Sequence, residues 1–271
     1  MDPLQWCRDR LLVPGHPLLA SLLFVPEEQR ARILALKALV AELAALDDPG
    51  MDSSVRAAKS GWWLRALSEG AAHPALEALQ VSRAAEQVPP PAFLPLFQAI
   101  TSGLEGLRLE RYEQLWAHAL AIGGEAARLE LSLSTGFQQG HEAAAMQLGA
   151  AGYLFRLVRD LAVDAAANRW LVPLDLQAQF QVGRSDVLDR QGGPGWDGLV
   201  RTLLERAVRA GQEAALQLPH VHRHLHLYWA LDRRLASRLA RRPGDILARR
   251  VVPGHAGNVW VAWRAARRLK D

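Results

Sequence analysis

The chain has 271 residues, half of them apolar, and is therefore long enough to bury one large hydrophobic core. Its 32 Lys and Arg residues against 28 acidic residues leave a formal charge of +4, which identifies no partner, and nucleic acid is not expected. The single cysteine, Cys7, excludes an internal disulfide, and neither a secretory leader nor an apolar run of membrane-spanning length is evident. A cytoplasmic protein is expected.

The first strongly periodic segment predicts a helix from Pro26 to Asp48. Proline fits the first turn of a helix, and the carboxylates of Glu27 and Glu28 suit the positive end of its dipole. Pro49 and the glycine after it end the segment. Its apolar residues recur at spacings of three and four, as in Ile33, Leu36, Leu39, Val40, Leu43 and Leu46.

The rest of the chain follows the same helical pattern, with few strand signals and no internal repeat. Residues 182–195, which are rich in glycine, predict an irregular connection. We therefore expect one all-α domain over residues 1–271. The further predicted helices run from about Ser53 to Gly70, after Pro74, from the break at Pro89 to about Thr135, from His141 to about Ala167, from Trp196 to Leu218, and around Trp229 to Arg241 and Val259 to Leu269.

Basic residues gather near the C-terminal end of the sequence, in and between the last two predicted helices. Such a segment suits either a solvated arginine face or contact with an anionic membrane surface, and both interpretations stay open. Only Asp232, Asp245 and Asp271 oppose this charge. The basic residues are Arg233, Arg234, Arg238, Arg241, Arg242, Arg249, Arg250, Arg264, Arg267, Arg268 and Lys270.

The segment from Tyr153 to Asp175, YLFRLVRDLAVDAAANRWLVPLD, places Asp160 and Asp164 four residues apart on a predicted helix. Both carboxylates then share one helix face. Paired carboxylates of this kind suit Mg²⁺, which binds a few carboxylates, waters and the oxygens of a phosphorylated substrate. A solvated pair is the common alternative for this spacing.

The segment NRWLVPLDLQAQFQV that follows resembles the end of the second aspartate-rich motif of the squalene/phytoene synthase family. Three further stretches agree in order and spacing with that family, so the resemblance covers nearly the whole chain. They are LLASLLFVPEEQRARILALKALV, LERYEQLWAHA and GDILARRVVPGHAGNVWVAWRAARR.

This resemblance implies an all-α, isoprenoid-synthase-like helical bundle around a central apolar cavity. It also implies a prenyl diphosphate substrate, such as farnesyl or geranylgeranyl diphosphate, held through Mg²⁺ and ionised at its allylic carbon. Charge on the departing diphosphate requires cations, and the carbocation requires a dry pocket. The implied metal ligands are Asp160, Asp164 and Asp48, and the implied substrate-binding residues are Tyr153, Arg156 and Arg159.

The first aspartate-rich motif of the family is eroded here. The helix reads LVAELAALDD where the family has a pattern such as FxxxxDDIxD, so Ala44 and Ala45 replace two aspartates and Asp48 keeps a carboxylate beside Asp47. Pairing Asp48 with Asp52 instead fits the spacing but places Pro49 within the helical face.

The second motif is also altered, because Tyr153 and Arg156 occupy positions where the family has Gln and Asn. Either the diphosphate is held differently, or the aspartates form a structural ion network with Arg156 and Arg159. The segment LVAELAALDD followed by Trp62 and Trp63 is similar to a branch that includes a mitochondrial assembly factor of respiratory complex I. The alternatives are therefore a divergent prenyl-diphosphate protein and a non-catalytic assembly protein.

We expect neither a catalytic nor a metal-binding role for two groups of aromatic residues, a histidine run and the tryptophans. The alternating His220, His222, His224 and His226 are expected at a polar helix start after Pro219, because no cysteine or acid completes a metal site. Tryptophans in the periodic segments are expected in the core or the cavity wall. They are Trp62, Trp63, Trp229, Trp260 and Trp263.

Overall fold

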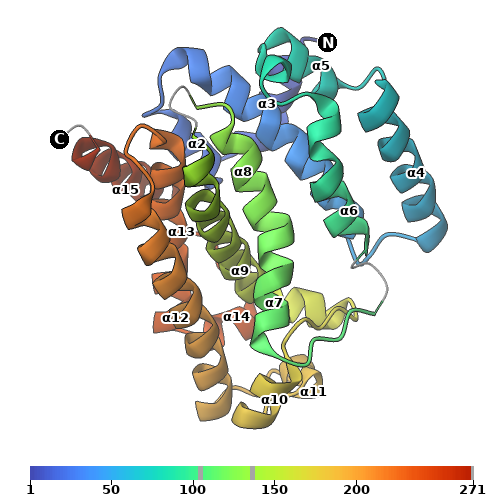
Figure 1. Ribbon diagram of the computed structural model, residues 1–271. Helices are drawn as coiled ribbons and strands as arrows, with labels where there is room; N and C mark the ends of the chain where they lie inside the picture. The colour runs from blue at the N-terminus through green and yellow to red at the C-terminus, as the bar shows by residue number, and fades with distance from the viewer. Residues whose placement is uncertain (103–105, 135–137, 270–271) are drawn as a thin grey trace.

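The computed structural model describes residues 1–102, 106–134 and 138–269, and these ranges contain helices and turns but no strand (Figure 1). The first helices are α1 (Pro3–Leu11), α2 (Pro17–Leu22), α3 (Glu27–Ala44), α4 (Ser53–Glu69), α5 (Pro74–Val81) and α6 (Leu94–Ser102). They are followed by α7 (Tyr112–Ala119), the π-helical turn η4 (Leu120–Gly124), α8 (Glu125–Leu131), α9 (Glu142–Ala166), α10 (Leu174–Phe180), α11 (Arg184–Leu188), α12 (Pro194–Gln217), α13 (Arg223–Arg241), α14 (Gly244–Ala248) and α15 (His255–Arg268).

The predicted boundaries of α3 and α4 are confirmed and have local causes. α3 begins with Glu27 after Pro26 and continues into a short 3₁₀ turn, Ala45–Asp47. The carboxylate of Asp52 accepts hydrogen bonds from the backbone N–H groups of Ser54 and Val55, at 2.8 and 3.3 Å, and so caps α4. The chain then leaves α4 at Gly70, whose φ of 86° suits glycine.

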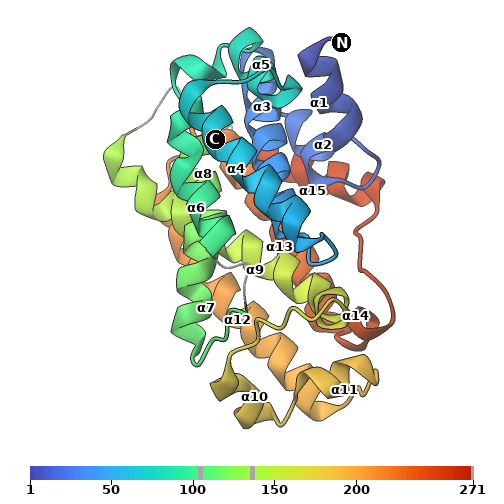
Figure 2. The same cartoon turned by 90° about the vertical axis from the view of Figure 1, so that its right-hand side faces the viewer.

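Helix α9 lies at the centre of the bundle (Figure 2). It contacts α8, α12, α13 and η4. Gly149 of α9 lies so close to η4 that a Cβ atom there would be 2.1 Å from the carbonyl oxygen of Gly123. This contact requires glycine and brings the two segments together beside the site described below.

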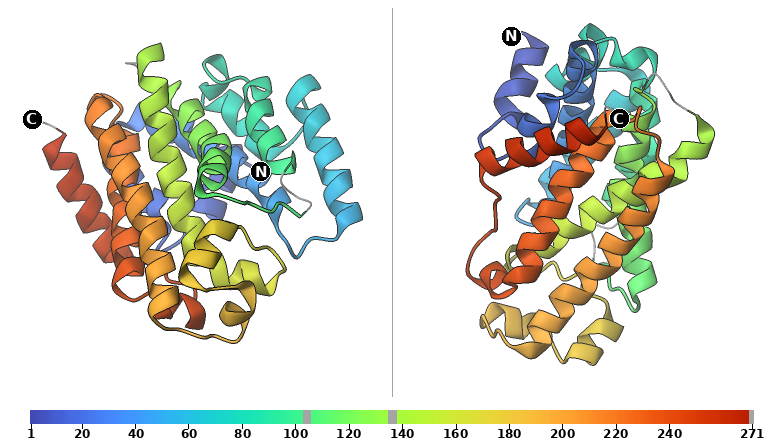
Figure 3. Two further views of the ribbon diagram at one scale, coloured as in Figure 1. Left: turned by 60° about the horizontal axis from the view of Figure 1, so that its bottom comes forward. Right: turned by 90° about the vertical axis from the view of Figure 1, so that its left-hand side faces the viewer.

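Two apolar clusters fill the interior, one mostly from residues before 134 and one mostly from residues after 108. The first contains Leu36, Leu39 and Phe93, and the second contains Phe155 and Trp196. Tyr153 of α9 packs against both clusters. The bundle therefore has α9 as a shared wall, and α12 and α13 run beside it (Figure 3).

Several short helices were not predicted. α1, α2 and α10 carry no long periodic pattern, and α11 lies within residues 182–195, where an irregular connection was expected. The Asp186 carboxylate caps α11 by accepting from the Gly183 N–H at 2.6 Å. Helices this short depend on caps and tertiary packing, which periodicity does not reveal.

The long helical stretches predicted between Pro89 and Thr135 correspond to α6, to α7 and to α8. Residues 106–111 are non-helical and separate α6 from α7, while Thr135 itself lies outside the described residues. The helices α12 and α15 begin two and four residues before their predicted starts, at Pro194 and His255. Within the described ranges, no helix combines the length and apolarity needed to cross a bilayer.

Candidate functional site

Helix α9 positions both predicted carboxylates near its C-terminal end. Leu157 and Leu161 of the same helix are buried, which fixes the rotation of α9 against the second apolar cluster. The side chain of Asp160 is 21% exposed and that of Asp164 is 8% exposed. Neither side chain therefore points freely into solvent.

The carboxylate of Asp160 is held by two arginines. Arg159 donates at 2.9 and 2.5 Å, and Arg250, from the segment after α14, donates at 2.8 and 3.0 Å. Burial alone would raise the pKa of Asp160, but these hydrogen bonds outweigh it and hold the pKa below its ordinary value. Both oxygens of Asp160 are thus bound by guanidinium groups in bidentate geometry.

The carboxylate of Asp164 is paired with Arg169 by the way α9 ends. Asn168 adopts a left-handed conformation, with φ of 62°, and the Arg169 N–H then bonds the Asp164 carbonyl at 2.8 Å. The Arg169 guanidinium returns over the helix end and donates to the Asp164 carboxylate at 2.8 Å. A cation there offsets the unfavourable placement of a carboxylate at the negative end of a helix.

Arg169 also reaches the end of α3. Its guanidinium forms an ion pair with the Asp47 carboxylate and donates to the Asp47 carbonyl oxygen at 2.9 Å. Burial raises the pKa of Asp47 and of Asp164 above the ordinary value, although Arg169 lowers both. We call Asp47, Asp164 and Arg169 the arginine clasp, because one guanidinium joins the two helix ends.

Asp48 does not take part in this clasp. It is exposed, and its carboxylate accepts from the Gly50 N–H at 2.9 Å. The carboxylate that the structure brings toward Asp164 is therefore that of Asp47, whereas the carboxylate of the predicted metal ligand Asp48 is bound by the Gly50 N–H.

Two adjoining cavities lie beside α9. The first, the apolar cavity, has a volume of about 220 Å³ and is bordered by Leu18, Leu148 and Leu225 among others. The second, the arginine mouth, has a volume of about 290 Å³ and contains Arg156, Arg159 and Arg250 in its wall. The two cavities share His16, Arg156, Tyr228 and Asp232.

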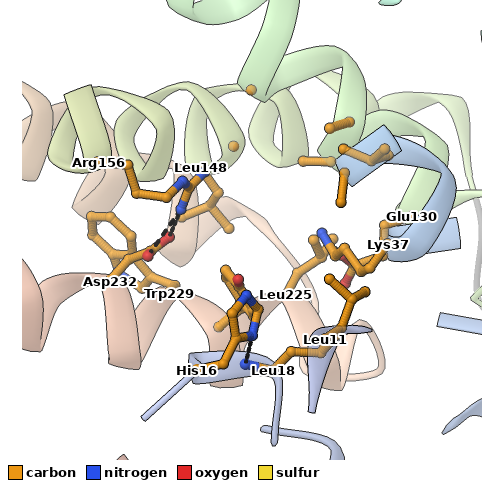
Figure 4. Close-up of a pocket in the computed structure, with 17 residues that line it drawn as sticks. Leu11, His16, Leu18, Lys37, Glu130, Leu148, Arg156, Leu225, Trp229 and Asp232 are labelled. Atoms are coloured by element: carbon orange, nitrogen blue, oxygen red, sulfur yellow. Dashed lines mark hydrogen bonds and ion pairs between the residues drawn. The ribbon is translucent and has the colours of Figure 1, made fainter. Parts of the chain in front are cut away.

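Figure 4 shows the polar side chains at the two ends of the apolar cavity. Arg156 donates to both oxygens of Asp232 at one end, at 3.1 and 3.2 Å, while Lys37 and Glu130 lie at the other, with 2.6 Å between Lys37 Nζ and Glu130 Oε2. Leucines lie between these polar groups. An elongated apolar ligand with one anionic end fits this distribution of side chains.

His16 and Tyr153 are held neutral. Burial and the nearby Arg156 and Arg159 lower the pKa of His16 to about 4. Tyr153, predicted as a substrate-binding residue, forms a hydrogen bond to His118 Nε2 at 3.1 Å, and burial raises its pKa. It is not among the residues that border the two cavities, whereas Arg156 and Arg159 are.

Several cavity residues escaped prediction. Lys37 and Glu130 read as ordinary positions of amphipathic helices, and His16 precedes a helix that was not predicted. In the sequence, Arg250 is one of many basic residues near the C-terminal end. Asp232 is one of the few acids that oppose them, and no local pattern indicates its pairing with Arg156.

The side chains around Asp160 and Asp164 do not fit a magnesium cluster. Mg²⁺ requires carboxylate oxygens that are free to coordinate it, but here guanidinium groups hold Asp160, Asp164 and Asp47. Over the described ranges, no group of three His, Cys, Asp or Glu side chains is placed to hold an ion. These carboxylates therefore serve as partners of arginine in this arrangement, not as magnesium ligands.

The histidine segment differs from the expected polar helix start. His222, His224 and His226 are buried, with exposed fractions of 1%, 4% and 9%. His224 Nδ1 lies 2.6 Å from Glu130 Oε1, and His226 Nε2 lies 3.0 Å from the Leu218 carbonyl oxygen. His222, at the N-cap of α13, likewise has its Nε2 atom 2.8 Å from His141 Nδ1, so each of the three rings has a partner within the protein.

Two tryptophans differ from the expected core positions. Trp260 and Trp263 are 54% and 43% exposed. Small residues, Ala262 and Ala266, form the buried face of α15 instead. Trp63 and Trp229 are buried as expected, and Trp229 borders the apolar cavity.

Comparison with known proteins gives a consistent result. The sequence profile of the family described as squalene/phytoene synthase matches residues 15–255. A phytoene synthase of Thermus thermophilus is 27% identical over 134 residues, which is 49% of this chain and 46% of that protein. The match thus spans about half the length of this curated relative.

Solved structures share the fold over nearly the whole chain. The squalene synthase HpnC from Alicyclobacillus acidocaldarius has a TM-score of 0.70 at 21% identity, covering 90% of this chain and 94% of that one. A dehydrosqualene synthase has a TM-score of 0.76 at 14% identity over 99% and 96%. YisP from Bacillus subtilis has a TM-score of 0.71 at 15% identity over 96% and 95%. The chain therefore has the all-α isoprenoid-synthase fold.

Proposed function

The chain belongs to the squalene/phytoene synthase family, and from this premise we propose that it binds a prenyl diphosphate in isoprenoid metabolism. The diphosphate occupies the arginine mouth, and the isoprenoid tail occupies the apolar cavity. Farnesyl and geranylgeranyl diphosphate are the candidate ligands. Both aspartate-rich motifs are altered, so the proposal concerns binding of the ligand.

One observation carries this proposal: a cavity bordered by three arginines adjoins a cavity bordered by leucines, and the two share Arg156. Guanidinium groups bind phosphate oxygens through paired hydrogen bonds. Each cavity alone is small, since ligand sites usually hold about 300–1,000 Å³, so the ligand must occupy both. An amphiphile with an anionic head meets that condition.

The alternative is a non-catalytic interaction protein, of the kind that acts in respiratory complex I assembly. That role predicts a filled or closed cavity. The two cavities, of about 220 and 290 Å³, favour ligand binding instead.

Titration calorimetry with farnesyl diphosphate, geranylgeranyl diphosphate and farnesol, in buffer containing Mg²⁺, tests the proposal. At least one diphosphate is expected to bind about tenfold or more tightly than farnesol, because charged hydrogen bonds hold the head group. Replacing Ala41 of the apolar cavity with phenylalanine should weaken prenyl diphosphate binding by about tenfold or more while leaving inorganic diphosphate unaffected. Exposed Ala58 of α4, replaced in the same way, is the control. No diphosphate binding at all would overturn the proposal and favour the interaction role.

We also propose that α13 and α15 contact an anionic membrane surface. Arg234, Arg238, Arg241, Arg242 and Arg249 border a shallow hollow of about 660 Å³ together with Trp260, and Asp245 is the one acid there. The guanidinium groups of Arg264 and Arg267 lie over the rings of Trp260 and Trp263, with centroid distances of 5.4 and 5.2 Å. Helix α15 lies at the outside of the bundle (Figure 3). Exposed tryptophans beside arginines suit the interface of an anionic bilayer.

Sedimentation with vesicles tests this contact. Vesicles containing phosphatidylglycerol should retain the protein, and pure phosphatidylcholine vesicles should not. Arg238→Gln should weaken the binding about fivefold, since each basic residue near an anionic surface contributes about 1 kcal/mol, and Arg65→Gln on exposed α4 should change nothing. Equal retention by both kinds of vesicle, or by neither, would contradict the proposal.

A further inference from the structure

Two of the three arginines of the mouth are held in place by one carboxylate, Asp160, that the family motif would assign to a metal. Arg159 and Arg250 approach Asp160 from two sides, and each donates two hydrogen bonds to it. Arg159 comes from α9 itself, while Arg250 lies 90 residues beyond Asp160 in the chain. Asp160 therefore orients both guanidinium groups at the edge of the cavity that they border.

Positive charge exceeds negative charge at this mouth. Three guanidinium groups, of Arg156, Arg159 and Arg250, are opposed by the two carboxylates of Asp160 and Asp232. The Arg250 side chain is 58% exposed, so its pairing with Asp160 is screened by water and readily exchanged. An anionic ligand with several oxygens is therefore able to take over the hydrogen bonds that Arg250 donates to Asp160.

The arginine clasp supplies a second part of the argument. Arg169 links Asp47, at the end of α3, to Asp164 of α9. The two helix ends that would carry the aspartate-rich motifs are thus joined by a guanidinium cation of the chain itself. The carboxylates need no added cation to lie close together.

The geometry points to arginine-mediated, magnesium-independent binding of the diphosphate head group, in which Arg159 and Arg250 are ligand-binding residues and Asp160 is their positioning residue. This inference rests on the proposed prenyl-diphosphate binding. It assigns Arg250 to the site. Asp160 and the head group then compete for the same hydrogen bonds from Arg159 and Arg250.

Titration calorimetry with farnesyl diphosphate, performed in EDTA and again in Mg²⁺, tests this inference. The dissociation constants are expected to agree within about threefold. Binding that requires Mg²⁺ would overturn the inference and leave the proposed function standing. Absence of binding in both buffers, for geranylgeranyl diphosphate as well as for farnesyl diphosphate, would overturn the proposed function itself.

Substitutions of the two arginines test whether their guanidinium groups bind the head group. Arg250→Gln and Arg159→Gln should each weaken binding about tenfold to hundredfold in EDTA, because each removes charged hydrogen bonds to the head group. Each variant should fold, since Asp160 keeps the other arginine. Arg65→Gln on exposed α4 is the matched control and should change the affinity less than about threefold.

Asp160→Asn gives opposite results for the two interpretations. If Asp160 competes with the ligand, the variant should bind farnesyl diphosphate as tightly as the native chain or about threefold to tenfold more tightly. If Asp160 is a metal ligand, the variant should lose Mg²⁺-dependent affinity by about tenfold or more, and the inference would be wrong.

Discussion

Replacing Arg169 with methionine is expected to lower the free energy of unfolding by about 3–5 kcal/mol, because it leaves buried carboxylates without a cation. The Asp164 side chain is 8% exposed and that of Asp47 is 26% exposed. Methionine retains most of the length of the arginine side chain, so loss of charge dominates over loss of volume. Urea unfolding followed by circular dichroism measures the change.

The dependence on pH identifies the cause. Burial already raises the pKa of Asp47 and of Asp164 with Arg169 present, and without that arginine both pKa values rise further. When the pKa of a carboxyl group is raised in the folded state, the protein loses stability as the pH rises through that pKa. The deficit of Arg169→Met should therefore be small in acid, where both groups are protonated, and should grow as the pH rises.

Two further variants control this experiment. Adding Asp164→Asn to Arg169→Met should recover part of the lost stability, because it removes one of the two unpaired charges. Arg65→Met on exposed α4 should stay within about 0.5 kcal/mol of the native chain. A loss below about 1 kcal/mol in Arg169→Met, or no recovery in the double variant, would show that the clasp does not stabilise the fold.

Sequence reasoning located α9 and its carboxylates because both signals are local. Apolar periodicity defines the helix, and the four-residue spacing places Asp160 and Asp164 on one face. Two partners of these carboxylates are local, since Arg159 is next to Asp160 and Arg169 is five residues from Asp164. Two other members of the network are distant, because Asp47 is 122 residues from Arg169 and Arg250 is 90 residues from Asp160. No spacing rule connects positions so far apart, so only the folded chain shows the ion pairs of Asp47 and Arg250.

The exposed tryptophans show a different limit. Trp260 and Trp263 lie three residues apart on α15, and tryptophans in such a periodic segment are predicted to be buried. The helix instead buries Ala262 and Asn258. Small side chains allow close packing of α15 against α13, and this close approach decides the orientation.

A buried ion network lies at the other end of the apolar cavity, and breaking it is the second substitution for which we expect a large loss of stability. Glu130 is 3% exposed and lies 2.6 Å from both Lys37 Nζ and His224 Nδ1. His224 Nε2 lies 2.9 Å from the hydroxyl of Ser21, which is fully buried. Because Ser21 has no access to a substrate, we assign it no role as a nucleophile. The hydrogen bonds instead connect α2, α3, α8 and α13 around the cavity.

Replacing Glu130 with glutamine is expected to destabilise the protein by about 3 kcal/mol at neutral pH, because Lys37 is left without its counter-ion at the cavity wall. Exposed Glu69 of α4, replaced by glutamine, serves as the control and should have little effect. Chemical unfolding of both variants measures the difference. Equal stability of the two variants would show that the network adds nothing to the fold.

Acid titration gives this prediction a second readout. Burial would raise the pKa of Glu130, but Lys37 and His224 outweigh it and lower the pKa from 4.5 to about 2. A carboxyl group with a lowered pKa contributes its full stability above its unfolded value and loses that contribution as the pH falls toward its folded value. The native chain should therefore lose stability between about pH 4.5 and pH 2 relative to Glu130→Gln, so that the two unfolding curves converge in acid. A constant difference across that range would mean that Glu130 acts through its shape and hydrogen bonds rather than through its charge.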